Sequence, residues 1–237
     1  MTIFEHLEEF RYRLVISAVA FFIGSIIAYF LFHQILHLLE LPIDKGGRIA
    51  GVTIKGGLSV QGVTTAFTVR LKIAIFGGFV IALPVILFQI WRFITPGLEP
   101  QEKKYAIPFV LGSVGLFLFG AVVAYLVLPE ALGFLLRFGR GLNQIIFLDQ
   151  YIGFVTFMVL AFAITFEIPM LLLFLAAAGV VSSQWLRKHR RHAIVVSVIV
   201  AAVATPSQDP YSNGMLAIPL YLMYEAAVLI VRFVMKK

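Results

Sequence analysis

Six long apolar segments, separated by polar connections, constrain this chain more than any other feature of its sequence. A helix needs about 20 apolar residues to cross the hydrocarbon core of a bilayer. Only 13% of the residues are charged and 61% are hydrophobic, whereas roughly a quarter of the residues in a soluble domain are charged. The sequence therefore predicts an all-α, polytopic membrane protein with a single domain over 1–237 and spans at 14–32, 73–90, 107–128, 152–178, 193–204 and 215–231.

The last two predicted spans are short. The segment 193–204 offers about 12 apolar positions, or roughly 18 Å of helix, so we expect it to reach only part of the way across the bilayer. The sixth segment is also short and contains Glu225. Two short helices beside four longer ones predict a concave, lopsided bundle, and an even number of spans places both termini on one side of the membrane.

The positions of lysine and arginine predict the orientation. Of the 19 such residues, 12 lie on the side that carries both termini and the connections 91–106 and 179–192, which leaves 7 on the other side. Cytoplasmic connections carry the excess of basic residues, so we expect both termini in the cytoplasm. The same clustering between apolar runs explains the net charge of +7 without nucleic acid.

The first external connection, 33–72, is the longest and is rich in glycine. Its glycines alternate with β-branched residues, a pattern typical of turns and short extended pieces. The sequence therefore predicts a turn-rich lid here.

Two acidic groups share the predicted cytoplasmic face. Glu8 and Glu9 lie close to Arg11 and Arg13 near the N-terminus, and Glu102 follows the second span in a proline-containing connection. Such clusters are most often solvated helix faces neutralised by their own arginines. The alternative is a docking site for a cationic peptide, because a carboxylate can accept two parallel hydrogen bonds from one guanidinium group. The spacing of the residues leaves both interpretations open.

Glu167 lies near the middle of the fourth span, where a carboxylate costs at least a few kcal/mol. We expect it to face the bundle interior or a wet cavity, protonated or hydrogen-bonded to a polar partner. Pro169 frees a backbone carbonyl nearby. For Glu225, which lies beside Tyr224 in the sixth span, interhelical hydrogen bonding or snorkelling is the stronger interpretation, and a weaker one is a partner interface.

No pattern typical of an enzyme is present. The sequence has no His-Glu-x-x-His, no phosphate-binding glycine loop and no Gly-x-Ser-x-Gly, and it contains no cysteine. His33 and His37 are spaced as two metal ligands would be on a helix, but no third ligand lies nearby. We therefore predict no catalytic residue, no bound metal and no cofactor.

Several separate stretches resemble the TatC family, the receptor subunits of the twin-arginine protein translocase, and together they cover nearly the whole chain. The first is His6-Leu7-Glu8-Glu9-Phe10-Arg11, which is similar to the opening motif of the family. The others run from Ala82-Leu83-Pro84 through Gln89-Ile90-Trp91-Arg92-Phe93 to Pro96-Gly97-Leu98 and Glu102-Lys103-Lys104, then Phe166-Glu167-Ile168-Pro169, Thr205-Pro206 with Asp209, Ala217-Ile218-Pro219-Leu220, and Tyr224-Glu225.

This resemblance implies a receptor that binds the twin-arginine signal peptide of folded precursor proteins. It also implies a location in the cytoplasmic (inner) membrane, assembly with TatA- and TatB-type subunits, export driven by the proton-motive force, and a homo-oligomer within the complex. Glu9 and Glu102 match the signal-peptide carboxylates of the family, and Glu167 matches its intramembrane glutamate. The residues that match their neighbours are Glu8, Arg11, Phe93, Pro96 and Leu98.

One stretch departs from the family. Before Phe67 the family usually has a proline and a glutamate, whereas this chain has the run Val63-Thr64-Thr65-Ala66. The role of the external connection 33–66 is therefore left open, with Pro42 there and Asp209 in the last external connection as weak candidate contacts.

Two other functions fit parts of the sequence. An intramembrane carboxylate near helix-breaking prolines is typical of an ion-coupled secondary transporter or channel, but no inverted repeat is visible. A purely structural scaffold would retain function and partner binding when Glu9, Glu102 or Glu167 is neutralised.

Overall fold

The structure is a computed structural model that describes residues 3–52, 57–94, 106–142, 144–204 and 210–233. The described residues are almost entirely helical, which confirms the predicted all-α class. In chain order the helices are α1 (Ile3–Phe30), α2 (Phe32–Ala50), α3 (Thr65–Ile94), α4 (Ala106–Phe138), α5 (Leu148–Thr165), α6 (Ile168–Ala177), α7 (Ser183–Lys188), α8 (Arg190–Ala204) and α9 (Pro210–Phe233).

Five stretches among the described residues are long and apolar enough to cross a membrane. They match five of the predicted spans and lie at Phe4–Phe30, Thr65–Ile94, Ile107–Phe138, Leu148–Ala177 and Asn213–Phe233. The stretch in α9, with 21 residues, is the shortest of the five. The remaining predicted span corresponds to α8, whose 15 residues give a helix of about 22 Å against a hydrocarbon core of about 30 Å.

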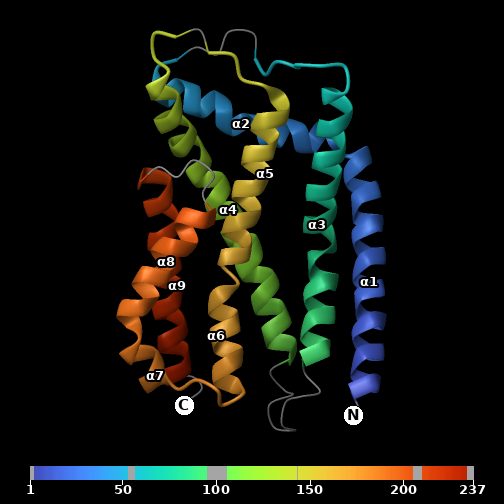
Figure 1. The fold of residues 1–237 in the computed structure, drawn as a ribbon, viewed down its shortest axis with the longest axis vertical. Helices are drawn as coiled ribbons and strands as arrows, with labels where there is room; N and C mark the ends of the chain where they lie inside the picture. The colour runs from blue at the N-terminus through green and yellow to red at the C-terminus, as the bar shows by residue number, and fades with distance from the viewer. Residues whose placement is uncertain (1–2, 53–56, 95–105, 143, 205–209, 234–237) are drawn as a thin grey trace.

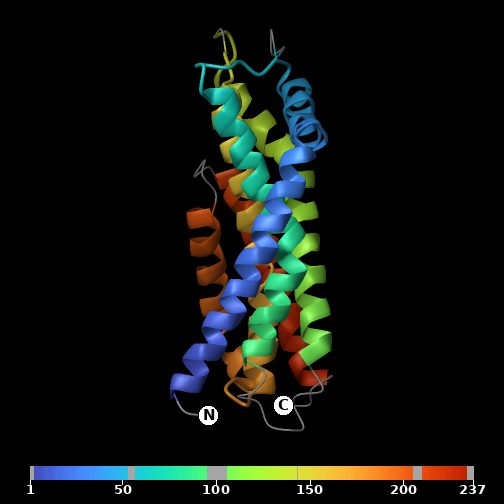
Figure 2. The same cartoon turned by 90° about the vertical axis from the view of Figure 1, so that its right-hand side faces the viewer.

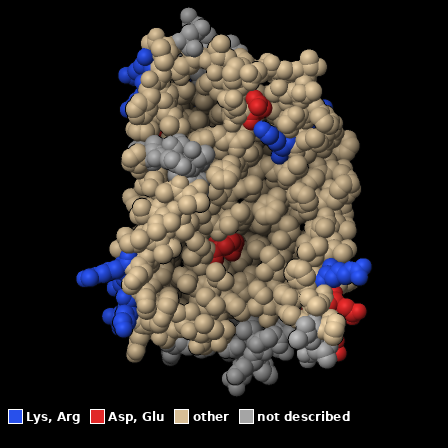
Figure 3. Space-filling model, in the orientation of Figure 1, with Lys and Arg blue, Asp and Glu red and all other residues tan. Residues whose placement is uncertain are grey.

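The bundle is lopsided because the α8–α9 hairpin is shorter than its neighbours. Figure 1 shows α1, α3, α4 and the α5–α6 pair standing upright, with the hairpin at one edge ending well below the upper end of α4 and α5. The turned view in Figure 2 agrees, and in both views the two chain ends lie at the same lower end of the molecule. Figure 3 shows charged groups mainly toward the two ends of this face, with a broad band of low charge between them.

The first external connection differs from the predicted turn-rich lid, because most of it is the helix α2. Its buried positions recur at helical spacing and pack on α4: Leu39, Pro42, Ile43, Gly46, Gly47 and Ala50. A Cβ atom at Gly46 would lie 2.8 Å from the Leu132 Cβ atom, so glycine allows the two helices to approach closely. Tertiary packing thus outweighs the low helix propensity of glycine. Gly51, with a φ of 66°, ends the helix.

One short extended piece follows α2, as predicted. The Ser59 N–H donates to the Ile146 carbonyl and the Leu148 N–H donates to the Ser59 carbonyl, both at 2.9 Å. These bonds form a parallel bridge between Ser59 and Phe147. The bridge joins the first external connection to the segment that leads into α5.

Side chains from neighbouring helices hold α2 across the top of the bundle. Pro42 has no N–H and so leaves the Leu38 carbonyl without its helical donor; the Tyr125 hydroxyl donates to that carbonyl at 2.7 Å. At the C-terminus of α2, Arg140 donates to the Ala50 carbonyl at 2.8 Å and Arg137 to the Ile49 carbonyl at 3.2 Å. Cations suit this negative end of the helix dipole.

Candidate functional site

The N-terminal end of α1 is positioned by close packing against α3. Small residues of both helices meet near the middle: a Cβ atom at Gly78 would lie 2.6 Å from the Ser25 Cα atom, and one at Gly24 would lie 2.7 Å from the Gly78 carbonyl oxygen. Small residues at a helix interface let the backbones approach closely in a membrane. The approach brings the first turns of α1 beside the last turns of α3.

Glu9 and Arg13 form an ion pair one turn apart on α1. The Arg13 Nε atom donates to Glu9 Oε1 at 3.0 Å, and its Nη1 atom reaches Gln89 Oε1 on α3 at 3.4 Å. The two charged side chains are only 15% and 13% exposed. Among the described residues, the second carboxylate oxygen of Glu9 is buried and has no hydrogen-bond partner. Glu9 therefore retains an unused acceptor.

Aromatic rings of α1 and α3 meet near the N-terminal end of α1 and the C-terminal end of α3. The Phe93 ring stacks on His6, with centroids 4.4 Å apart, and lies 5.5 Å from the Phe10 ring at a tilted angle. His6 and Phe10 are exposed, as are Glu8 and Arg11. The cation that contacts Glu9 is Arg13, and Arg11 lies at an exposed position of the same helix.

Several predicted site residues cannot be placed relative to this cluster. Pro96, Leu98 and Glu102 lie outside the described residues, which stop at Ile94 and resume at Ala106, and the weak candidate Asp209 is also outside them. Pro42 is buried within α2.

Glu167 lies where the fourth span is broken between α5 and α6. Pro169 follows at the start of α6, so the helical hydrogen-bond ladder is interrupted here. The Ser113 side chain on α4 lies near the Glu167 carboxyl group, and the Ser113 hydroxyl accepts a bond of 3.1 Å from Trp91 Nε1 on α3. One oxygen of Glu167, Oε1, is buried and has no hydrogen-bond partner among the described residues.

Glu225 makes the interhelical hydrogen bond predicted for it. Its Oε2 atom accepts from Arg190 Nη2 of α8 at 2.6 Å, and its Oε1 atom accepts from the Tyr221 hydroxyl at 2.8 Å. The Tyr224 hydroxyl donates to the Leu186 carbonyl of α7 at 2.7 Å. These bonds join α9 to α7 and to the N-terminal end of α8.

The described residues contain no group of three or more histidine, aspartate or glutamate side chains that could hold a metal ion. His33 and His37 both lie on α2 and are exposed.

Comparison with known proteins decides the family. A family model described as Sec-independent protein translocase protein (TatC) matches residues 5–219. The chain belongs to the TatC family. It is 40% identical to TatC of Aquifex aeolicus over 244 residues, covering all of this chain and 97% of that relative. TatC of Frankia casuarinae is also 40% identical, over 237 residues, and this chain covers 65% of that longer relative.

A crystal structure described as the twin arginine translocase receptor TatC has the same fold. It matches this chain with a TM-score of 0.80 at 39% identity, covering 97% of this chain and 99% of that one. The chain is therefore a multi-pass membrane component of a Sec-independent protein translocase, as predicted. The comparisons do not favour an ion-coupled transporter.

Three polar residues near Glu9 and Glu167 were not predicted as site residues from the sequence: Gln89, Ser113 and Trp91. Gln89 and Ser113 are buried polar side chains inside apolar spans, and such residues are uncommon in a membrane unless they have partners. That signal could have selected them. Trp91 carried no such signal, because its role depends on which helix faces its indole N–H.

Proposed function

We propose that this chain is the receptor of the translocase, binding the twin-arginine signal peptide of folded precursor proteins at the cytoplasmic ends of α1 and α3. The observation that carries the proposal is the Glu9 carboxylate, which already accepts a guanidinium group from Arg13 and keeps a second, buried oxygen without a partner among the described residues. A guanidinium group of the signal peptide would supply the missing donor.

The surroundings of Glu9 favour arginine over lysine. A planar guanidinium group can bond a carboxylate and stack on an aromatic face at once, whereas an ammonium group is a compact, strongly hydrated charge. The rings of His6, Phe10 and Phe93 lie together beside the end of α3. They offer the apolar faces on which a guanidinium group or an apolar signal residue would lie.

In this proposal a second carboxylate, Glu102, pairs with the other guanidinium group. Pro96 and Leu98 precede it in the same connection and would line the path of the peptide. The exposed residues Glu8 and Arg11 would adjust the local charge around the pair. These roles rest on the match to the family motif.

The apolar part of the signal would then enter the bundle on the side where the α8–α9 hairpin is short. Glu167, with Ser113 behind it, is the polar group available there. TatA- and TatB-type subunits would assemble with the chain in the inner membrane, with Tyr224 and Glu225 as one possible contact, and export would use the proton-motive force. We further propose six spans, counting α8, cytoplasmic termini, and a homo-oligomer within the complex.

Peptide binding to the purified protein tests the proposal. A fluorescent twin-arginine signal peptide should bind the wild-type chain, and Glu9→Gln should weaken the binding roughly tenfold to a hundredfold, because a hydrogen bond to a charged group contributes about 1.5–3 kcal/mol. A peptide with two lysines should bind more weakly than the original.

The matched control is Glu5→Gln, which removes an exposed carboxylate from the same helix and should leave peptide affinity within about twofold, because exposed charges contribute little. Equal binding by the wild type and the Glu9→Gln variant, with unchanged thermal unfolding, would contradict the proposed site.

A further inference from the structure

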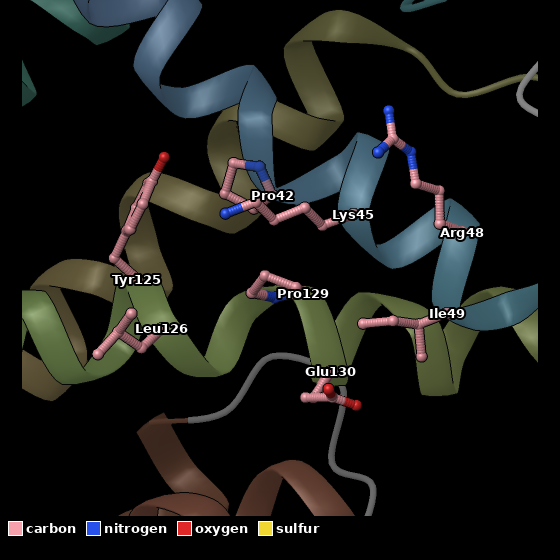
Figure 4. A pocket seen from close by; sticks show the side chains of 8 residues that line it. All are labelled: Pro42, Lys45, Arg48, Ile49, Tyr125, Leu126, Pro129 and Glu130. Atoms are coloured by element: carbon pink, nitrogen blue, oxygen red, sulfur yellow. The ribbon is translucent and has the colours of Figure 1, made fainter.

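A groove at the external end of the molecule lies between α2 and α4. Its volume is about 440 Å³, and the residues that line it are Pro42, Lys45, Arg48, Ile49, Tyr125, Leu126, Pro129 and Glu130. Figure 4 shows the Lys45 side chain running along α2 toward Tyr125, the Arg48 side chain extending away from α4, and the Glu130 carboxylate pointing away from α2. The groove thus combines basic groups from one helix with an apolar wall from the other.

The basic residues of this groove have no counter-ion in the described part of the chain. Neither Lys45 nor Arg48 makes an ion pair within 4.0 Å with a described carboxylate. The acidic residues of α2, Glu40 and Asp44, line a different recess with Gly57 and Leu58. An anion in the groove would therefore meet a positive potential.

The groove lies at the depth where a bilayer changes from hydrocarbon to headgroups. The apolar stretch of α4 begins at Ile107. At 1.5 Å per residue, Tyr125 lies about 28 Å along α4 from its start and Pro129 about 34 Å, while the hydrocarbon core is about 30 Å thick. Lys45 and Arg48, which α2 places over this part of α4, are thus at headgroup height.

An apolar track on α4 leads up to the groove. Leu118, Val122 and Leu126 recur every four residues, so they share one face of the helix. Their side chains are 47%, 55% and 69% exposed. A hydrocarbon chain lying along this face would end at Lys45 and Arg48.

We propose that the α2–α4 groove is a binding site for an anionic phospholipid of the outer leaflet. The lipid phosphate contacts Lys45, Arg48 adds to the positive potential around it, and one acyl chain lies along Leu118, Val122 and Leu126. Two cations without an ion pair in the described residues lie at headgroup depth, and an apolar track lies beneath them. A free anion would use only the cations, whereas a lipid would use both the cations and the track. The site is independent of the signal-peptide site, which lies at the opposite end of the bundle.

A photoactivatable phosphatidylglycerol analogue, added to the full chain in detergent, tests the site. Mass spectrometry of the cross-linked peptides should find the label on 42–49 and 118–130. Unlabelled phosphatidylglycerol should compete for this labelling, whereas phosphatidylcholine and inorganic phosphate should not. The double variant Lys45→Gln/Arg48→Gln should reduce the labelling roughly tenfold or more, because each basic residue near an anionic lipid contributes a few-fold to binding.

The matched control is Arg187→Gln/Lys188→Gln, which removes two exposed cations from α7 at the other end of the bundle and should leave the labelling of α2 and α4 unchanged. Competition by inorganic phosphate would show a free-anion site and overturn the proposal. Equal competition by phosphatidylcholine, or full labelling of the double variant, would overturn it as well.

Discussion

At the scale of single residues, Ser113 joins the aromatic end of α3 to the intramembrane carboxylate. Its side chain is 1% exposed; its hydroxyl accepts from Trp91 Nε1 at 3.1 Å and lies near the Glu167 carboxyl group. The Trp91 ring also stacks on Phe109, with centroids 4.9 Å apart. Trp91 therefore contributes both apolar packing and one hydrogen-bond donor, and substitution can separate the two.

Trp91→Phe should keep an aromatic ring in the stack, but it removes the N–H donor and makes the ring system smaller. The expected cost is about 1–3 kcal/mol, of which the hydrogen bond contributes about 1 kcal/mol, whereas Trp91→Ala should cost about 3–5 kcal/mol because it removes the whole ring and leaves a larger cavity. Unfolding of both variants in the same detergent measures the difference. Equal loss of stability in the two variants would show that the hydrogen bond to Ser113 is not a separable contribution.

The carboxyl group of Glu40 on α2 predicts how the stability of the folded chain depends on pH. Burial raises the pKa of this carboxyl group, Asp44 adds to the rise, and His37 opposes it. Because the folded-state pKa is above its ordinary value of 4.5, ionised Glu40 destabilises the folded chain at neutral pH, and this penalty disappears as the pH falls through the raised pKa to the ordinary value. Glu40→Gln should therefore unfold at a higher temperature than wild type at pH 7 and at the same temperature near pH 4.

The control for this pH dependence is Glu130→Gln, which removes an exposed carboxylate from α4. Its unfolding temperature should follow that of the wild type from pH 4 to pH 7. A Glu40→Gln variant that is no more stable than wild type at pH 7 would contradict the assignment.

The site was predictable from sequence only in part. Glu9 and Glu167 could be selected because carboxylates are costly or unusual where they occur, and the family motif includes both. The pairing of Glu9 with Arg13 on the same helix follows from the spacing. The contact of Arg13 with Gln89 and the link from Trp91 to Ser113 depend on the packing of three helices, and helix rotation cannot be read from uniformly apolar spans.

At the scale of elements, the α1–α3 contact determines where the candidate site lies, because α1 carries Glu9 and α3 carries Gln89 and Phe93. Apolar attraction between helices is weak in lipid, so close packing of small residues and interhelical hydrogen bonds hold the two helices together. Gly24 and Gly78 provide that packing. A change there should affect both stability and the site.

Gly78→Ala should push α1 away from α3. The added Cβ atom would lie 2.6 Å from the backbone of Ser25, and overpacking of this kind costs about 1–3 kcal/mol. The matched control is Gly115→Ala on α4, where no other atom lies within 4 Å of the added Cβ and a better helix former is neutral or slightly stabilising. Thermal unfolding separates the two, and equal stability of the variants would contradict the close α1–α3 contact.

Elements were predicted well where the apolar runs were long and poorly where glycines dominated. Five predicted spans appear as long apolar helices, because hydropathy alone determines them. α2 was missed because its glycines suggested turns, although Gly46 and Gly47 are buried within the helix. Their role is to allow close approach to α4, which only the tertiary structure reveals.

At the scale of the whole molecule, the described chain ends lie at the same end of the bundle (Figures 1 and 2). Together with the excess of basic residues on that side, this predicts cytoplasmic termini. A fluorescent protein fused to the C-terminus should be fluorescent and alkaline phosphatase fused there should be inactive. The same enzyme fused after Gly141 should be active. An active phosphatase at the C-terminus would contradict the orientation.

The central claim is a direct contact between Glu9 and an arginine of the signal peptide, and a double-mutant cycle tests it most directly. Peptide affinity is measured for wild type and Glu9→Gln, each with the original peptide and with one arginine of the pair replaced by glutamine. Contact predicts an interaction energy of at least about 1 kcal/mol for one of the two arginines. Effects that add within about 0.3–0.5 kcal/mol for both arginines would contradict the contact.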